Sequence, residues 1–259
     1  IQDIALSANW MAACGHAGED AKLFDTVKAV SDLAKSLQIC IPVGKDSLSM
    51  NTIWNEDNTA RQVYSPLSVN ITAFAPVCDI RKSLTPQLKT NEDSSLLSID
   101  LGNHQNRLGG SCLAQVYNAF GTQTSDLDDP ALLSSFFQGI QLLNEMGLIM
   151  AYHDRSDGGL FVTLCEMAFA GHVGVDININ NEASQLISHM FSEEPGAVIQ
   201  VNNLYLDGVI KTLVDSGLPK SLIQVIGKPT ADKNFKITFN SNPVFSESLS
   251  VLHGFWSNT

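Results

Sequence analysis

The chain has 259 residues, of which 44% are hydrophobic, and its formal net charge is −12 at pH 7. A chain of this length and composition buries a sizeable core in one large or two moderate domains, which argues against disorder. The acidic balance, 27 Asp and Glu against 15 Lys and Arg, argues against nucleic acid as a partner. No uninterrupted apolar run is long enough to cross a membrane, so we expect no membrane partner.

The first predicted unit covers residues 1–79. A helix begins at Glu19 or Asp20, because apolar residues recur at helical spacing from Leu23 to Leu37. Its predicted strands lie at residues 4–9, 39–43, 49–54 and 67–75. Residues 80–95 show little apolar periodicity, so we expect them to connect this unit to a second domain.

The second predicted unit covers residues 96–259, in which strands interleave with helices. Strands are predicted at residues 96–101, 148–152, 175–179, 197–201, 222–226 and 235–239. Helices are predicted at residues 111–120, about 130–146, 160–171 and 204–216. Such alternation indicates a mixed α/β domain.

The five cysteines lie far apart and form no C-x-x-C pair. This spacing disfavours a zinc knuckle or a redox pair. An odd, scattered set in apolar surroundings instead predicts reduced, buried thiols in a cytoplasmic protein. Cys112 and Cys165 fall within helix-like apolar patterns, where packing is favoured over the role of a glutaminase nucleophile.

The most informative segment is the polar turn His153–Gly159, which joins an apolar strand to an apolar helix that ends at Gly171. Asp154 offers the hard oxygen ligand that Mg2+ prefers. The N–H groups of the first helical turn and the helix dipole favour a phosphate there, and Gly158 and Gly159 allow close approach of the backbone.

A simpler explanation of this turn is also open. Ser156 or Asp157 could do no more than cap the helix, and Asp154 could pair with Arg155 or with a distant base. For the turn taken alone, the capping explanation is favoured.

Three other segments invite functional explanations that their spacing weakens. Gly44-Lys45-Asp46-Ser47 fails the P-loop pattern, although Lys45 could reach a phosphate as a point charge; a solvated loop lysine is the alternative. Leu108-Gly109-Gly110-Ser111 lacks dinucleotide spacing, so close helix–strand packing is favoured. Glu193 and Glu194 are neighbours before a strand and predict a solvated turn.

Five stretches, in order, resemble the large single-chain form of phosphoribosylformylglycinamidine synthase (FGAM synthase). They are Leu6–Ala13, Ile41–Met50, Arg107–Gln115, His153–Leu160 with its continuation Glu166–Gly171, and Val244–Ser248. The resemblance covers almost the whole chain and matches the later portion of the second of two synthetase halves. The family's preceding segment, its other half and its glutaminase domain are not matched, and the start at Ile1 suggests an incomplete chain.

The resemblance implies an α/β fold like that of aminoimidazole ribonucleotide synthetase. Residues 1–79 correspond to the latter part of the barrel-forming N-terminal domain, residues 80–95 to the connection and residues 96–259 to the C-terminal α/β domain. The family converts formylglycinamide ribonucleotide to formylglycinamidine ribonucleotide in purine biosynthesis, using ATP, Mg2+ and glutamine-derived ammonia in the cytoplasm. Its members imply a nucleotide, the ribonucleotide substrate and the rest of the parent chain as partners.

At the level of residues, the resemblance assigns Mg2+ binding to Asp154 and nucleotide contact to Ser156. Lys45 is a weaker phosphate candidate, because the corresponding family segment lies near the synthetase cleft. No catalytic residue is assigned, since this half resembles an auxiliary site that holds ATP or ADP without turnover. We therefore expect a structural nucleotide-binding segment; a stand-alone ATP-using relative, of the selenophosphate synthetase or thiamine-phosphate kinase type, is the alternative.

Overall fold

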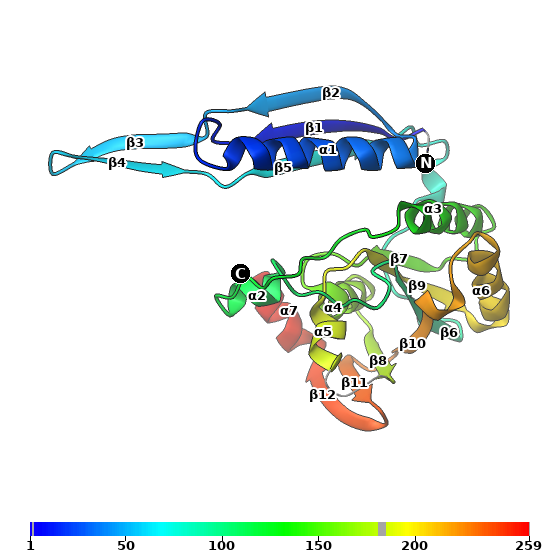
Figure 1. Cartoon of the computed structure of the whole chain (residues 1–259). Helices are drawn as coiled ribbons and strands as arrows, with labels where there is room; N and C mark the ends of the chain where they lie inside the picture. The colour runs from blue at the N-terminus through cyan, green and yellow to red at the C-terminus, as the bar shows by residue number, and fades with distance from the viewer. Residues whose placement is uncertain (2, 181–184, 259) are drawn as a thin grey trace. The chain divides into compact units, whose positions relative to one another are not determined.

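The computed structural model describes residues 1, 3–180 and 185–258. The chain divides into two compact units, Ile1–Cys78 and Asp79–Thr259 (Figure 1). Residues 80–95, the expected connection, belong to the second unit, where Leu88 is buried in the core. The assignment of residues 1–79, 80–95 and 96–259 to the parts of a synthetase stays a prediction.

The first unit is a small sheet with one helix and a hairpin. Its elements are β1 (Ala5–Met11), α1 (Glu19–Leu37), β2 (Cys40–Ser47), β3 (Asn51–Glu56), β4 (Thr59–Tyr64) and β5 (Ser68–Phe74). In the sheet, β1 pairs with β2 in parallel and with β5 in antiparallel orientation. β3 and β4 form a separate hairpin closed by Asp57 and Asn58, both at positive φ, as a two-residue hairpin turn requires.

The second unit is built on a seven-stranded sheet in the order β12-β11-β8-β10-β6-β9-β7. Its strands are β6 (Ser94–Asp100), β7 (Ala151–Asp154), β8 (Gly174–Ile179), β9 (Gly196–Asn202), β10 (Ile223–Thr230), β11 (Asn234–Phe239) and β12 (Asn242–Ser248). Its helices are α2 (Cys112–Val116), α3 (Pro130–Glu145), α4 (Gly159–Gly171), α5 (Leu186–Phe191), α6 (Leu206–Asp215) and α7 (Leu249–Ser257). Short 3-10 turns occupy Ile80–Lys82, Asn203–Tyr205 and Lys220–Leu222.

Helices cover both faces of this sheet, so the unit has three layers. Successive residues of β6 point to opposite faces: Leu96 belongs to the core that α4 covers, whereas Leu97 belongs to the core that α3 and α6 cover. The α4 side also holds residues of α5 and α7, which pack against α4. The mixed α/β architecture predicted from the alternation of strands and helices is confirmed.

The helices and the cysteines each bear on a general property of the chain. Within the described ranges, no helix combines the length and the apolarity needed to cross a membrane. All five cysteines are free thiols, but the expectation that they are buried holds fully for Cys165 alone. Cys14 and Cys112 are half-buried, and Cys40 and Cys78 are exposed. Cys40 is exposed because β2 lies at an edge of the first sheet.

Candidate functional site

The turn between β7 and α4 lies at the edge of the seven-stranded sheet. The strand that precedes it runs from Ala151 to Asp154, later than the predicted 148–152, because Leu148 still bonds back to the end of α3 through its N–H and the Leu143 carbonyl. Asp154 is thus the last residue of the strand and its side chain is exposed. The predicted helix is confirmed: α4 begins at Gly159 and ends at Gly171.

The start of α4 depends on two glycines and not on a side-chain cap. Gly158 is the N-cap, at φ 79°, and no side chain caps the helix. The explanation that Ser156 or Asp157 caps α4 is therefore wrong. Gly159 has φ +68°, and a Cβ there would lie 2.6 Å from the Ser192 carbonyl oxygen, so the close approach requires glycine.

The Asp154 carboxylate is held from one side by the half-buried phenol of Tyr152. Tyr152 donates its hydroxyl to Asp154 Oδ1 at 2.5 Å. Burial, and then the hydrogen bond to Asp154, raises the pKa of Tyr152, so the phenol remains a donor at neutral pH. Because the Asp154 side chain is exposed, its carboxylate can bind a further ligand from solvent.

His153 and Arg155, on either side of Asp154, are both anchored within the domain. His153 places Nδ1 2.7 Å from the Asp154 carbonyl oxygen and Nε2 2.8 Å from Glu166 Oε2. Arg155 is 5% exposed and donates to Asp100 Oδ1 at 2.5 Å and to the Glu194 carbonyl oxygen at 2.6 Å. The explanation that Asp154 pairs with Arg155 is wrong, since Arg155 pairs with Asp100.

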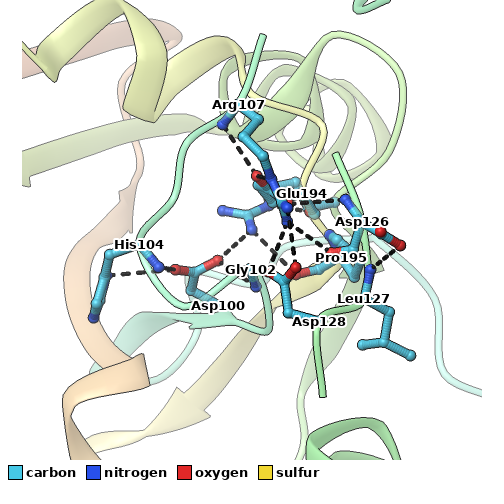
Figure 2. A network of polar contacts seen from close by, with 10 residues as sticks. Asp100, Gly102, His104, Arg107, Asp126, Leu127, Asp128, Glu194 and Pro195 are labelled. Atoms are coloured by element: carbon cyan, nitrogen blue, oxygen red, sulfur yellow. Dashed lines mark hydrogen bonds and ion pairs between the residues drawn. The ribbon is translucent and has the colours of Figure 1, made fainter. Parts of the chain in front are cut away.

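Glu194 lies in a buried ion network and not in a solvated turn. In Figure 2, Arg107 reaches both Glu194 and Asp128. Arg107 Nε lies 2.6 Å from Glu194 Oε1, and the Glu194 side chain is 0% exposed. The expectation of a solvated turn is thus wrong for Glu194, because Arg107, 87 residues away in the sequence, supplies the charge that a buried carboxylate requires.

Glu193 fills part of the anion-binding position that the sequence predicts at the start of α4. Its Oε1 accepts hydrogen bonds of 2.8 Å from the N–H groups of Gly158 and Cys112, at the N-termini of α4 and α2. The expectation that the N–H groups at this turn are free for a ligand is therefore wrong for Gly158. No local pattern in the sequence reveals this contact, since Glu193 lies 35 residues beyond Gly158.

The other predicted site residues lie as follows. Ser156 is exposed in the turn, and its carbonyl oxygen accepts the Gly159 N–H at 2.9 Å. Lys45 lies in β2 of the first unit, exposed, with its ammonium hydrogen-bonded to the Ser47 hydroxyl. Gly109 approaches the backbone of Gln123, whose carbonyl oxygen would lie 2.4 Å from an added Cβ. The roles of Asp154, Ser156 and Lys45 toward a ligand stay predictions.

Two family models match the chain. The model of the FGAR-AT PurM_N-like domain matches residues 1–76, and that of the AIR synthase related protein, C-terminal domain, matches residues 98–240. The second match covers more than half of the chain.

Solved structures with the same fold agree with these models. The chain resembles T. maritima PurL complexed with ATP at 10% identity and TM-score 0.65, and T. maritima PurL complexed with FGAR at 9% and 0.64. Each match covers 96% of this chain, but only 37% of the PurL chain solved with ATP and 39% of the PurL chain solved with FGAR. With E. coli HypE the identity is 16% and the TM-score 0.66, covering 94% of this chain and 72% of HypE. The chain therefore belongs to the family of AIR synthase related proteins and is FGAM synthase-like, with an FGAR-AT PurM_N-like domain followed by the family's C-terminal domain.

Proposed function

We propose that this chain is a segment of an ATP-dependent, glutamine-using amidotransferase that makes formylglycinamidine ribonucleotide in purine biosynthesis. The FGAR-AT match of residues 1–76 supports this activity. PurL proteins of the same fold have been solved with ATP and with FGAR, which supports a nucleotide and the ribonucleotide as ligands. The chain spans 37% of the PurL chain, so the remaining parts of the parent protein are the partners that complete the reaction.

Within that enzyme, we assign this segment a structural nucleotide site at the β7–α4 turn. The observation that carries the assignment is an exposed Asp154 carboxylate directly before a helix whose N-terminus is formed by Gly158 and Gly159 without a side-chain cap. Ser156 is exposed between the carboxylate and the glycines, where its hydroxyl can contact a phosphate.

Mg2+ fits the donor set at this turn. It is commonly bound by one or two carboxylates together with water and substrate phosphates, and Asp154 supplies one such carboxylate. When bound, the ion neutralises the charge of the nucleotide phosphates, which an acidic chain would otherwise repel. Tyr152 fixes the orientation of the Asp154 carboxylate through its hydrogen bond to Oδ1.

A stand-alone relative of the same fold is the second candidate. It is favoured by the match to E. coli HypE, of which the chain spans 72%. The FGAR-AT-specific model on residues 1–76 favours the amidotransferase instead. Of the two, we therefore prefer the amidotransferase segment.

Calorimetric titration with ADP, with and without Mg2+, tests the nucleotide site. The chain should bind ADP only with Mg2+, and Asp154→Ala should weaken binding by about tenfold or more, which corresponds to at least about 1.4 kcal/mol. Asp207→Ala is the matched control, since Asp207 is an exposed acid in the first turn of α6. Equal affinities for the parent chain and Asp154→Ala, or no binding by the folded chain, would overturn the assignment.

A further inference from the structure

Three side chains that the proposed nucleotide site does not use meet beside the N-termini of α2 and α4. They are Cys112 at the first residue of α2, Asp157 in the turn before α4 and Glu193 in the turn before β9. Their sulfur and carboxylate oxygen atoms all lie within 4.8 Å of one another. Three segments that are far apart in the sequence thus bring one thiol and two carboxylates to a single point.

From this geometry we propose that Cys112, Asp157 and Glu193 form a binding site for a thiophilic divalent cation such as Zn2+. A site of one sulfur and two oxygen ligands suits Zn2+, whereas Mg2+ takes oxygen ligands alone. Three protein ligands leave the fourth tetrahedral position to water or to another ligand.

The Glu193 carboxylate is held in place before any ion binds. Its Oε1 accepts the N–H groups of Cys112 and Gly158, each at 2.8 Å. The next residue, Glu194, is fully buried and paired with Arg107, which anchors the turn that carries Glu193. These two hydrogen bonds orient the Glu193 carboxylate without a cation.

The three ligand atoms need to move only slightly closer together to bind a cation. In a tetrahedral zinc site with bonds of about 2.0–2.3 Å, the ligand atoms lie about 3.4–3.6 Å apart. The atoms here lie within 4.8 Å of one another, and the exposed Asp157 side chain can rotate to close the difference. The backbone of the other two ligands need not move, since Cys112 and Glu193 are already joined by a hydrogen bond.

Binding converts the thiol to a thiolate. Burial, a hydrogen bond to Glu193 and the charges of Glu193 and Asp157 raise the pKa of the Cys112 thiol, so the thiol is protonated in the metal-free protein. When the cation binds, the S–H bond breaks, the sulfur–metal bond forms and one proton passes to solvent. The ion would then link α2, the start of α4 and the turn before β9.

Titration of the reduced full chain with Co2+ tests this site, because a thiolate ligand gives a sulfur-to-cobalt charge-transfer band in the near ultraviolet. One equivalent of Co2+ should produce the band, and the band should disappear when Zn2+ displaces the Co2+. Cys112→Ser should abolish the band, whereas Cys40→Ser, at an exposed cysteine outside the cluster, should keep it. Asp157→Asn should weaken Co2+ binding by about tenfold.

Two further measurements make the outcome decisive. Circular dichroism should show that Cys112→Ser is folded, and Asp154→Ala should keep the Co2+ band, which separates this site from the proposed nucleotide site. A folded parent chain that gives no band, or a band of equal intensity in Cys112→Ser, would overturn the proposal.

Discussion

Glu194 and Arg155 are charged residues that the interior of the second domain accommodates by pairing. Arg155 lies between Asp154 and Ser156 in the sequence, and its guanidinium is bonded to Asp100 and to the carbonyl oxygens of Glu194 and Pro195. A buried charge is stable only with such partners. The network therefore fixes the backbone of the turn while leaving the Asp154 and Ser156 side chains exposed.

Removal of a buried partner from this network should lower the free energy of unfolding much more than removal of an exposed partner. Glu194→Ala leaves Arg107 without its buried partner, so we expect a loss of about 3–5 kcal/mol in the free energy of unfolding. Asp128→Ala is the matched control: Asp128 contacts the same guanidinium, but its side chain is 49% exposed, and we expect a loss of about 0–1 kcal/mol. Urea unfolding of both variants measures the difference, and equal losses would contradict the network's importance.

The buried His189 should make stability depend on pH. Burial, and then the charge of Arg155, lowers the pKa of His189, with His104 acting in the same direction and Asp100 opposing. The unfolded chain therefore takes up a proton near pH 6.5 that the folded chain resists, so this contribution to stability is lost as the pH falls below that value.

We expect the free energy of unfolding to fall from about pH 7.5 to about pH 5.5, and His189→Gln to flatten that slope. Burial opposes ionisation of Asp100, but the charge and the hydrogen bond of Arg155 outweigh it and lower the pKa of Asp100. Asp100 therefore affects the free energy of unfolding only in a more acidic range, below the ordinary Asp pKa of about 4. Urea titrations at the two pH values separate these groups. An unchanged slope in His189→Gln would rule out His189 as its source.

At the level of elements, the start of α4 depends on close backbone packing. Gly159→Ala would place a Cβ 2.6 Å from the Ser192 carbonyl oxygen at φ +68°, so we expect it to destabilise the domain by more than about 1 kcal/mol. Gly208→Ala in α6 has free space around its Cβ and should stabilise it by about 0.5–1 kcal/mol. Thermal or urea unfolding checks both, and effects of the same sign would contradict the account.

The elements that sequence patterns predicted well are those with strong local periodicity. The predicted helix at about 130–146 is Pro130–Glu145, and the predicted strand at 197–201 is the centre of Gly196–Asn202. Among the described residues, four of the helices and strands were missed: β4, α5, β12 and α7. α5 has only six residues, and β12 is mostly exposed, although the turn Asn240-Ser241 at positive φ is a hairpin signal that could have indicated it.

The candidate site was only partly predictable for a related reason. The carboxylate and the glycines of the β7–α4 turn are adjacent in the sequence, so a local pattern identifies them. The contacts of Glu193 and Glu194 join residues 35 to 87 positions apart, and no spacing rule reveals such contacts.

At the level of the whole molecule, the first unit has an exposed strand, β5, at one edge of its sheet. Every residue of β5 is exposed, including Val69, Ile71 and Phe74 at 38–51%. Open edge strands with exposed apolar side chains pair readily with other chains. We expect the isolated chain to associate as its concentration rises, and Ile71→Lys to reduce that association, in sedimentation velocity experiments. A chain that stays monomeric throughout would contradict this expectation.

The central claim is that the turn from Asp154 to Gly159 binds a magnesium nucleotide, and amide NMR of the whole chain tests it most directly. Adding ADP with Mg2+ to the ¹⁵N-labelled chain should shift the amide signals of Arg155 to Leu160, and ADP alone should not. The same addition to Asp154→Ala should leave those signals in place. Shifts confined to other residues, or none in a well-dispersed spectrum, would contradict the account.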